Sequence, residues 1–365
     1  MPNNQRINSI LEKANNLEFL SFNECIFLYQ HASLSQLLFV ANQIRQKIHP
    51  NNIVSYIIDR NINLTNVCVS NCLFCNFCRN KNSEQAYVLS IEKYIEKIEH
   101  LKSLGGNQIL LQGGMNPSLN LEYYETLFKE LKKFYPDLKL HALGPPEIAF
   151  LSKQEGISTK QCLQTLINAG LDSLPGGGAE ILSDRVRKLV SPAKVCSEQW
   201  LNIMHETHQL GLTTSATMMY GHLETIEERI EHFLKLRNIQ KIKPENAKGF
   251  ISFTAWSLAG KNTRLLKKYP KIKAVNSTEF LKMLALSRII LINIPNIQVS
   301  WLTRGKEIAK LALHGGANDM SSIMIEENVV SQAGKNFKLG VKEMEETILE
   351  AGFIPQLRNQ EYEYL

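Results

Sequence analysis

From residue 53 onward, short apolar runs alternate with helical stretches of a dozen or more residues. This alternation is typical of βαβ units, in which parallel strands are joined by crossover helices. Several helical stretches end at a glycine, among them Gly105, Gly170 and Gly211, as helices often do before the next strand. The pattern predicts eight strands, of which the fourth and the eighth are short and polar: 62–67, 108–112, 138–143, 173–175, 213–219, 250–255, 297–301 and 317–321.

Eight βα units preceded by a helical segment predict an α/β fold, a single (β/α)8 barrel of the TIM type. A doubly wound open sheet is the alternative, and the two differ in whether the last strand pairs with the first. We expect residues 1–52 to form an N-terminal helical cap, because their apolar residues recur at three- and four-residue spacing. Residues 53–340 would form the barrel, and residues 341–365 a C-terminal helix and tail packing on the barrel.

Composition excludes several other classes. Hydrophobic residues make up 44% and charged residues 21% of the 365, as in ordinary globular proteins. The net charge of +6 is too small to indicate a nucleic-acid partner. No run of 18 apolar residues could span a membrane, and the first ten residues lack the layout of a signal peptide. We therefore expect a cytoplasmic protein with no nucleic-acid and no membrane partner.

Four of the seven cysteines lie within residues 68–78, directly after the first predicted strand. Thiolates this close together select zinc, copper(I) or an iron–sulfur cluster. Structural zinc sites usually combine two separated cysteine pairs, and no second pair exists in this sequence. Three thiolates on one loop can instead hold three irons of a [4Fe-4S] cluster. We predict Cys68, Cys72 and Cys75 as ligands and leave Cys78 unassigned. A zinc-structured binding protein without catalysis stays the alternative of another class.

Glycine-rich segments follow two other predicted strands. Gln112, Gly113 and Gly114 follow the second strand, and three glycines precede Glu180 after the fourth. Glycines let the backbone approach a ligand closely, although a tight turn would use them too. Glu180 could accept hydrogen bonds from ribose hydroxyls or favour a helix N-terminus. Arg187 could meet a carboxylate with two hydrogen bonds or lie at the surface.

Polar residues at further strand ends are candidates for a general base. His141, His222 and Glu224 are the three main candidates, and Glu147 belongs to the same group. Histidine and glutamate are the side chains that most often move protons in enzymes. The sequence does not choose among them.

The spacing Cys-x3-Cys-x2-Cys, with Phe74 before the third cysteine, resembles the radical S-adenosylmethionine (SAM) superfamily. This resemblance implies a [4Fe-4S] cluster whose fourth iron binds SAM and cleaves it to a 5′-deoxyadenosyl radical. It also implies that Phe74 lies near the adenine and that the turn at 112–114 lies against the methionine end of SAM. Glu180 and Arg187 would belong to the same cofactor site.

Longer blocks resemble one family of this superfamily, the cyclic dehypoxanthine futalosine synthases of menaquinone biosynthesis. Among these blocks are NLTNVCVSNCLFCNFCR (63–79), QILLQGGMNP (108–117), AGLDSLPGGGAEIL (169–182) and GGANDMSSIMIEENV (315–329). The resemblance implies that the radical takes the C4′ hydrogen of the substrate ribose, followed by ring closure onto the benzoate. It also implies a reducing donor such as flavodoxin or ferredoxin.

Two related enzymes share the cysteine motif and stay open as alternatives, aminofutalosine synthase and the tyrosine-using half of the deazaflavin FO synthase. The sequence departs from the family pattern at Cys78, where tyrosine is common, and at residues 258–262 near the sixth strand. The second departure could alter a loop that contacts substrate.

Overall fold

The computed structural model describes residues 3–258, 260, 262–326 and 339–365. The departure predicted at 258–262 therefore lies partly outside the described residues, as does the end of the block at 315–329. No helix in the described ranges is long and apolar enough to cross a membrane.

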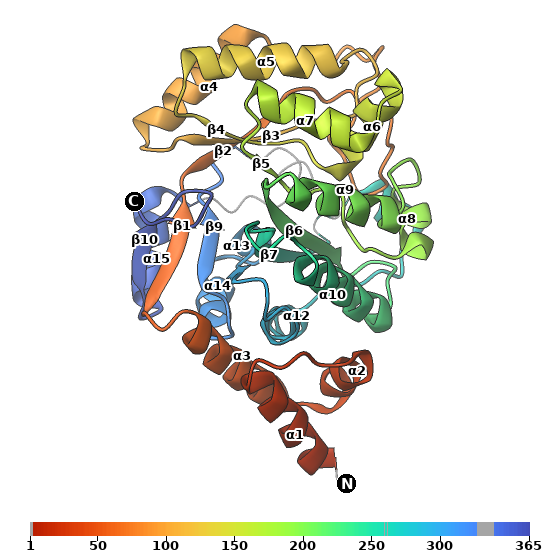
Figure 1. The fold of residues 1–365 in the computed structure, drawn as a ribbon. Helices are drawn as coiled ribbons and strands as arrows, with labels where there is room; N and C mark the ends of the chain where they lie inside the picture. Colours follow the sequence, from red (N-terminus) through yellow and green to blue (C-terminus); the bar gives the residue numbers. More distant parts are fainter. Residues whose placement is uncertain (1–2, 259, 261, 327–338) are drawn as a thin grey trace.

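Three helices form a layer of their own at the N-terminus. They are α1 (Asn3–Asn15), α2 (Phe22–His31) and α3 (Leu34–Ile48), and they lie below the rest of the molecule in Figure 1. Capping boxes built on Ser21 and Ser33 fix where α2 and α3 begin. The apolar face of α3 packs on α12 (Ser277–Ile290), and α2 packs on α10 (Ile226–Lys241).

The strands of the described residues form one parallel sheet. Its order is β10-β1-β9-β8-β7-β6-β5-β4-β3-β2. The bounds are β1 (Ile53–Ile57), β2 (Asp59–Asn63), β3 (Gln108–Gln112), β4 (Lys139–Ala142), β5 (Ser173–Leu174), β6 (Thr213–Tyr220), β7 (Phe250–Ser257), β8 (Asn296–Gln298), β9 (Asp319–Ser322) and β10 (Ile354–Leu357).

The barrel closes through a single stretch of chain. Only Ile58 separates β1 from β2, yet β1 pairs with β9 and β2 pairs with β3. Residues 53–63 thus join the last βα unit to the second one, and Figure 1 shows β1 beside β9. The prediction of a TIM-type barrel with a helical cap is confirmed.

Two strand predictions were wrong in position. The first strand lies at 53–63 rather than 62–67, because alternate positions in β2 carry polar side chains that face the barrel interior instead of an apolar run. In the predicted region, Thr65 and Val67 form only isolated bridges. The seventh strand, β8, ends at Gln298, and Trp301 begins the short helix α13 (Trp301–Arg304).

Helices follow the strands around the outside of the sheet, as Figure 1 shows for α4, α5, α7, α9 and α10. The remaining bounds are α4 (Ile91–Ser103), α5 (Leu121–Phe134), α6 (Pro145–Glu155), α7 (Thr159–Ala169), α8 (Asp184–Val190), α9 (Ser197–Gln209), α11 (Arg264–Lys268), α14 (Lys306–Leu313) and α15 (Val341–Glu350).

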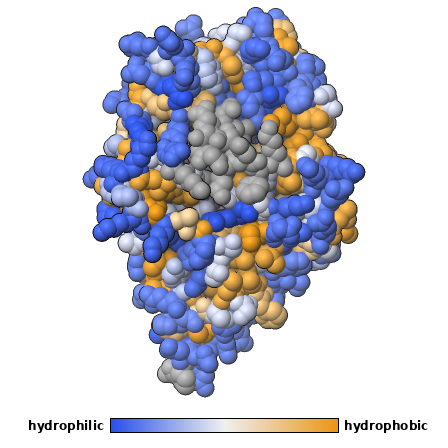
Figure 2. All heavy atoms as spheres, turned by 180° about the vertical axis from the view of Figure 1, so that it is seen from behind, coloured by the Kyte–Doolittle hydropathy of each residue, from blue (hydrophilic) through white to orange (hydrophobic). Residues whose placement is uncertain are grey.

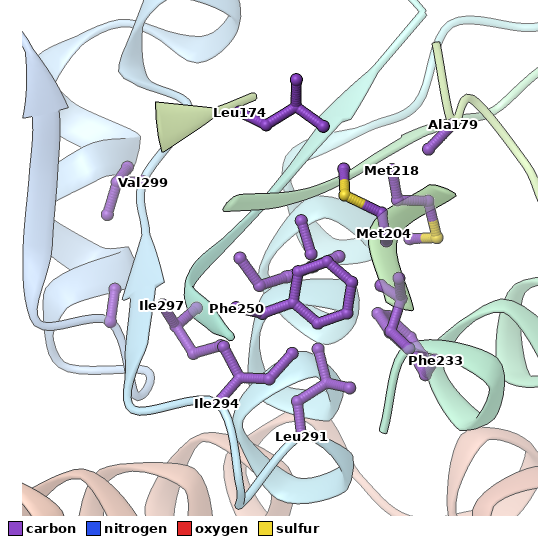
Figure 3. Packing of buried hydrophobic residues seen from close by; sticks show 14 of the residues in the cluster. Leu174, Ala179, Met204, Met218, Phe233, Phe250, Leu291, Ile294, Ile297 and Val299 are labelled. Atoms are coloured by element: carbon purple, nitrogen blue, oxygen red, sulfur yellow. The ribbon is translucent and has the colours of Figure 1, made fainter. Parts of the chain in front are cut away.

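The apolar core lies between the sheet and the surrounding helices. Phe250 of β7 occupies its centre in Figure 3, with Ile294 and Leu291 beside it and Phe233 of α10 nearby. All four side chains are fully buried. On the outer surface, hydrophilic residues cover most of the face in Figure 2, and apolar residues lie between them in separate groups.

The C-terminal tail closes the bottom of the barrel, the end where the strands begin. Strand β10 pairs with β1, and Arg358 then forms two hydrogen bonds, of 2.5 and 3.0 Å, with the carboxylate of Asp319 at the start of β9. Gln360 accepts a hydrogen bond from Gln108 at the start of β3. Glu361 contacts Thr213 at the start of β6. The tail therefore crosses the barrel from one side to the other.

Candidate active site

A cavity of about 450 Å³ lies inside the barrel. Its lining includes the loop of residues 68–78 at one end and Arg358 and Gln360 of the tail at the other. The walls between them carry polar side chains, including Asn61 of β2 and Gln298 of β8. TIM barrels usually fill this space with branched apolar side chains and place their active sites where the strands end. A polar interior that reaches the tail therefore indicates a deep binding site.

The three predicted ligand cysteines all line this cavity. The hydroxyl of Ser70 lies 3.0 Å from the sulfur of Cys68 and 3.3 Å from that of Cys72. The backbone N–H of Met115 donates to the Cys68 sulfur at 3.3 Å. Hydrogen bonds of this kind tune iron–sulfur centres and hold their ligands.

These residues fit an iron–sulfur cluster by donor type and position. The thiols of Cys68, Cys72 and Cys75 are free and face one space, and soft thiolates are the ligands that such clusters take. Within the described ranges, no three His, Cys, Asp or Glu side chains already converge on one metal position. The fit therefore rests on the donors and the shared cavity. Cys78 lines the cavity too, and its thiol donates to the carbonyl of Cys68 at 3.3 Å.

Gly113 and Gly114 allow the loop after β3 to pack against the cysteine loop. A Cβ at Gly114 would lie 2.0 Å from the carbonyl oxygen of Val67 and 2.8 Å from Cβ of Cys68. A Cβ at Gly113 would lie 2.8 Å from the Leu64 side chain. Both glycines and Gln112 line the cavity. The glycines thus have a packing reason beside their predicted role toward a cofactor.

Glu180 lies at the same end of the cavity as the cysteines. Its carboxylate is 2.8 Å from the ammonium group of Lys194, which also lies 5.7 Å from the centre of the Phe74 ring. All three residues line the cavity. Glu180 has a left-handed backbone conformation with φ of 41°, which is uncommon outside glycine. The second carboxylate oxygen of Glu180 is buried without a hydrogen-bond partner.

Arg187 does not belong to the cavity lining. It is buried, and its guanidinium donates to the carbonyls of Val195 and Ala179 at 2.8 and 2.6 Å. It lies 3.9 Å from the carboxylate of Glu180. Arg187 therefore positions the segments that carry Glu180 and Lys194.

Two of the base candidates line the cavity. The ring of His141 forms a hydrogen bond of 2.7 Å with the Ser173 hydroxyl, and burial lowers the pKa of His141 to about 3. Burial raises the pKa of Glu147 to about 7, and the positive charge of Lys194 partly opposes that rise. The pKa of Glu147 therefore lies near neutral pH, whereas that of His141 lies well below it.

His222 and Glu224 lie outside the cavity lining. The carboxylate of Glu224 accepts hydrogen bonds from the backbone N–H groups of Gly221 and His222 and pairs with Arg229 at 2.8 Å. The His222 ring lies 3.1 Å from the same carboxylate. Burial lowers the pKa of His222. These interactions of Glu224 hold the residues after β6 against Arg229 of α10.

Sequence reasoning missed Lys194, Arg358 and Gln360. Lys194 lies in a short connection between helices and carries no motif, and the two tail residues follow a strand that the pattern did not predict. Arg358 could have been suspected only from its place beside apolar residues near the C-terminus, which is a weak signal.

The fold and the cysteine loop define a radical SAM enzyme. Residues 62–236 match the family described as the radical SAM superfamily, and residues 247–365 match the CofH/MqnC C-terminal region. Two solved structures under 25% identical share the fold. The [FeFe]-hydrogenase maturase HydG has a TM-score of 0.74 and 18% identity, and the match covers 96% of this chain and 76% of HydG. Methylornithine synthase PylB has a TM-score of 0.73 and 18% identity, and the match covers 95% of this chain and 97% of PylB.

Proteins of similar sequence show which family of the radical SAM superfamily this chain belongs to. A cyclic dehypoxanthine futalosine synthase of Halalkalibacterium halodurans is 40% identical over 98% of this chain and 95% of its own length. A synthase of the same name from Streptomyces coelicolor is 38% identical over 94% of this chain and 84% of its own length. A 5-amino-6-(D-ribitylamino)uracil–L-tyrosine 4-hydroxyphenyl transferase of Methanosarcina mazei is 38% identical over 90% and 84%. The chain belongs to the radical SAM family that contains the cyclic dehypoxanthine futalosine synthases, and its cofactors are a [4Fe-4S] cluster and SAM.

Proposed function

We propose that this protein converts dehypoxanthine futalosine to cyclic dehypoxanthine futalosine in menaquinone biosynthesis. The observation that carries the proposal is the identity of 40% to a synthase of that name over 95% of its length. A [4Fe-4S] cluster held by Cys68, Cys72 and Cys75, with SAM bound beside it, would supply a 5′-deoxyadenosyl radical able to take the C4′ hydrogen of the substrate ribose. Ring closure onto the benzoate would follow, and the ring would regain its aromaticity by releasing one proton and passing one electron to an oxidised acceptor such as the cluster.

In this proposal the cofactors bind at one end of the cavity and the substrate at the other. Cys68, Cys72 and Cys75 would hold the cluster, and Phe74 and Glu180 would contact SAM beside it. The remaining space, down to Arg358, is left for the substrate. Because the tail closes that end, the barrel keeps a primary radical away from water.

Glu147 is the residue best placed to accept the proton lost from the ring. It lines the cavity, and a pKa near the working pH suits a general base. His141 lines the cavity too, but its low pKa makes it a weak proton acceptor. His222 and Glu224 would have to move to reach a substrate, since both are held by backbone hydrogen bonds outside the lining.

A second candidate function is transfer of the tyrosine side chain to 5-amino-6-(D-ribitylamino)uracil. The observation that favours it is the identity of 38% to the Methanosarcina mazei transferase over 84% of its length.

One anaerobic experiment separates the two. The reconstituted enzyme receives SAM, reductant and either dehypoxanthine futalosine or the tyrosine and uracil pair, and products are identified by mass. A product with the cyclic structure from the first mixture supports the proposal. If only the mixture of tyrosine and 5-amino-6-(D-ribitylamino)uracil gave a product, the transferase function would replace the proposed cyclisation. A preparation that binds one zinc and no iron would end both.

We further propose that the enzyme acts in the cytoplasm and receives electrons from flavodoxin or ferredoxin. The supporting observations are a catalytic cluster that needs a reductant and an amino-acid composition without a nucleic-acid or membrane signature.

A further inference from the structure

Helix α11 and the residues after it form a strongly basic surface. Arg264, Lys267, Lys268, Lys271 and Lys273 are all exposed, and we call these five residues the α11 surface. The sequence holds no Asp or Glu between residues 258 and 278. None of the five cations forms an ion pair with another residue that the structure describes. Their charge is therefore available to an outside partner.

The α11 surface is fixed directly on the cysteine loop. The buried Leu265 donates its backbone N–H to the carbonyl of Leu73 at 2.8 Å. The guanidinium of Arg264 donates to the carbonyl of Cys72 at 3.1 Å and to the Asn71 side chain at 3.4 Å. These contacts fix Arg264 on the loop that would hold the cluster, and the four lysines follow on the same short segment.

The cysteine loop adds an apolar side chain to this region. Val69, between two residues that line the cavity, is 44% exposed. An apolar contact with a charged rim is the usual composition of a small protein–protein interface. Encounters between redox proteins are small, weak and guided by opposite charge. A protein partner of this kind needs a negative surface to match the α11 surface.

We infer that the α11 surface docks an acidic one-electron carrier protein of the flavodoxin or ferredoxin class, which delivers its electron across the cysteine loop. This inference rests on the proposed function, since it assigns the place where the reductant binds. The carrier is oxidised by one electron and the enzyme's cluster is reduced by one, with no bond made or broken. Arg264 holds the loop and the four lysines supply most of the attraction.

The test measures binding of an oxidised acidic flavodoxin to the anaerobic holoenzyme by titration calorimetry. The K267E/K268E variant should bind about tenfold more weakly than wild type at low salt, and the difference should shrink at 0.5 M salt. The matched control K133E/K241E changes the same net charge at two exposed lysines, in the last turns of α5 and α10. It should bind as wild type does.

Cofactor-dependent readouts separate this inference from the proposed function. With dithionite as reductant, K267E/K268E should form 5′-deoxyadenosine at the wild-type rate, because a small reductant needs no docking. With reduced flavodoxin, its rate should fall about tenfold. Equal affinity of wild type and K267E/K268E would overturn the inference, as would an equal loss in the control. Absence of the cyclic product, with these differences intact, would overturn only the proposed substrate.

Discussion

The ammonium group of Lys194 lies 2.8 Å from the Glu180 carboxylate, beside the cysteine loop and in the wall of the cavity. Sequence reasoning considered only the carboxylate. The two charges are both largely buried, so each compensates the other where water cannot. A cofactor that carries an ammonium and a carboxylate, as SAM does, would meet both partners at this end of the cavity.

Replacing Lys194 by methionine should therefore affect stability and cofactor binding together. K194M leaves the buried Glu180 carboxylate with the more distant Arg187, at 3.9 Å, as its ion-pair partner, and unfolding should require about 3 kcal/mol less. The double variant K194M/E180Q should recover most of this stability but not SAM affinity. Chemical denaturation and SAM binding, measured side by side, check the two parts. Full recovery of SAM binding in the double variant would contradict a cofactor role for the pair.

The four crowded cysteines should differ in their effect on iron content. Alanine at Cys68, Cys72 or Cys75 should each abolish the cluster, because each thiolate is one of three protein ligands. C78S should keep about four irons per chain, since the Cys78 thiol already donates to a backbone carbonyl. Iron analysis and cluster absorbance after anaerobic reconstitution check this. Loss of iron in C78S equal to that in C75A would make Cys78 a ligand.

The substitution G114A should disrupt the cysteine loop. Its Cβ would lie 2.0 Å from the carbonyl oxygen of Val67, so one of the two loops must move. We expect a lower melting temperature and a preparation that retains less iron. G340A is the control, because among the residues that the structure describes the nearest atom to a Cβ there is a Glu343 side-chain oxygen at 3.9 Å. Its iron content should match wild type.

Glu147 should make both stability and activity depend on pH. Its pKa rises from 4.5 to about 7 on burial, so the folded protein keeps a proton that the unfolded chain releases between these values. Stability should therefore fall as pH rises from about 4.5 to 7, and level off above. In E147Q this part of the fall should be absent, as seen by denaturation at pH 5 and pH 8.

The pH dependence of product formation tests the role of Glu147 in a separate measurement. If Glu147 accepts the ring proton, the rate of product formation should rise with pH through about 7 in wild type. E147Q should lose that rise and still form 5′-deoxyadenosine. An unchanged pH profile in E147Q would return the role of base to the other candidates, beginning with His141.

The buried pair of Arg358 and Asp319 should contribute strongly to stability. R358M should reduce the free energy of unfolding by about 3–5 kcal/mol, because it leaves the Asp319 carboxylate uncompensated inside the barrel. The double variant R358M/D319N should be more stable than R358M. Denaturant titrations of wild type, R358M, D319N and the double variant measure the coupling. Simple addition of the two single effects would show that the ion pair contributes no coupling.

Local patterns predicted the barrel well where one strand face is apolar. Strands β3, β6 and β7 lie at or within two residues of their expected bounds, because their apolar residues follow one period. The pattern failed at residues 53–63, whose second half turns Asp59, Asn61 and Asn63 toward the cavity. A polar cavity removes the apolar signal that strand prediction depends on.

The candidate site was predictable where a motif was local. The three cysteines and the glycines after β3 lie together as their positions at strand ends implied. Which base candidates face the cavity depends on side-chain direction at each strand end, and local sequence does not specify it. Lys194 and Arg358 reach the site through tertiary packing from segments with no periodic pattern.

The pairing of β1 with β10 joins residues 53–57 to residues 354–357. A ribosome makes the first of these strands about three hundred residues before its partner. Long-range pairing of this kind is slow and leaves sheet edges open meanwhile. Strand β1 can therefore pair with β9 before residues 354–361 are made, but until then the cavity stays open at the end that the tail covers. Synthesis of residues 354–361, rather than of any catalytic motif, sets the moment at which the cavity acquires its floor.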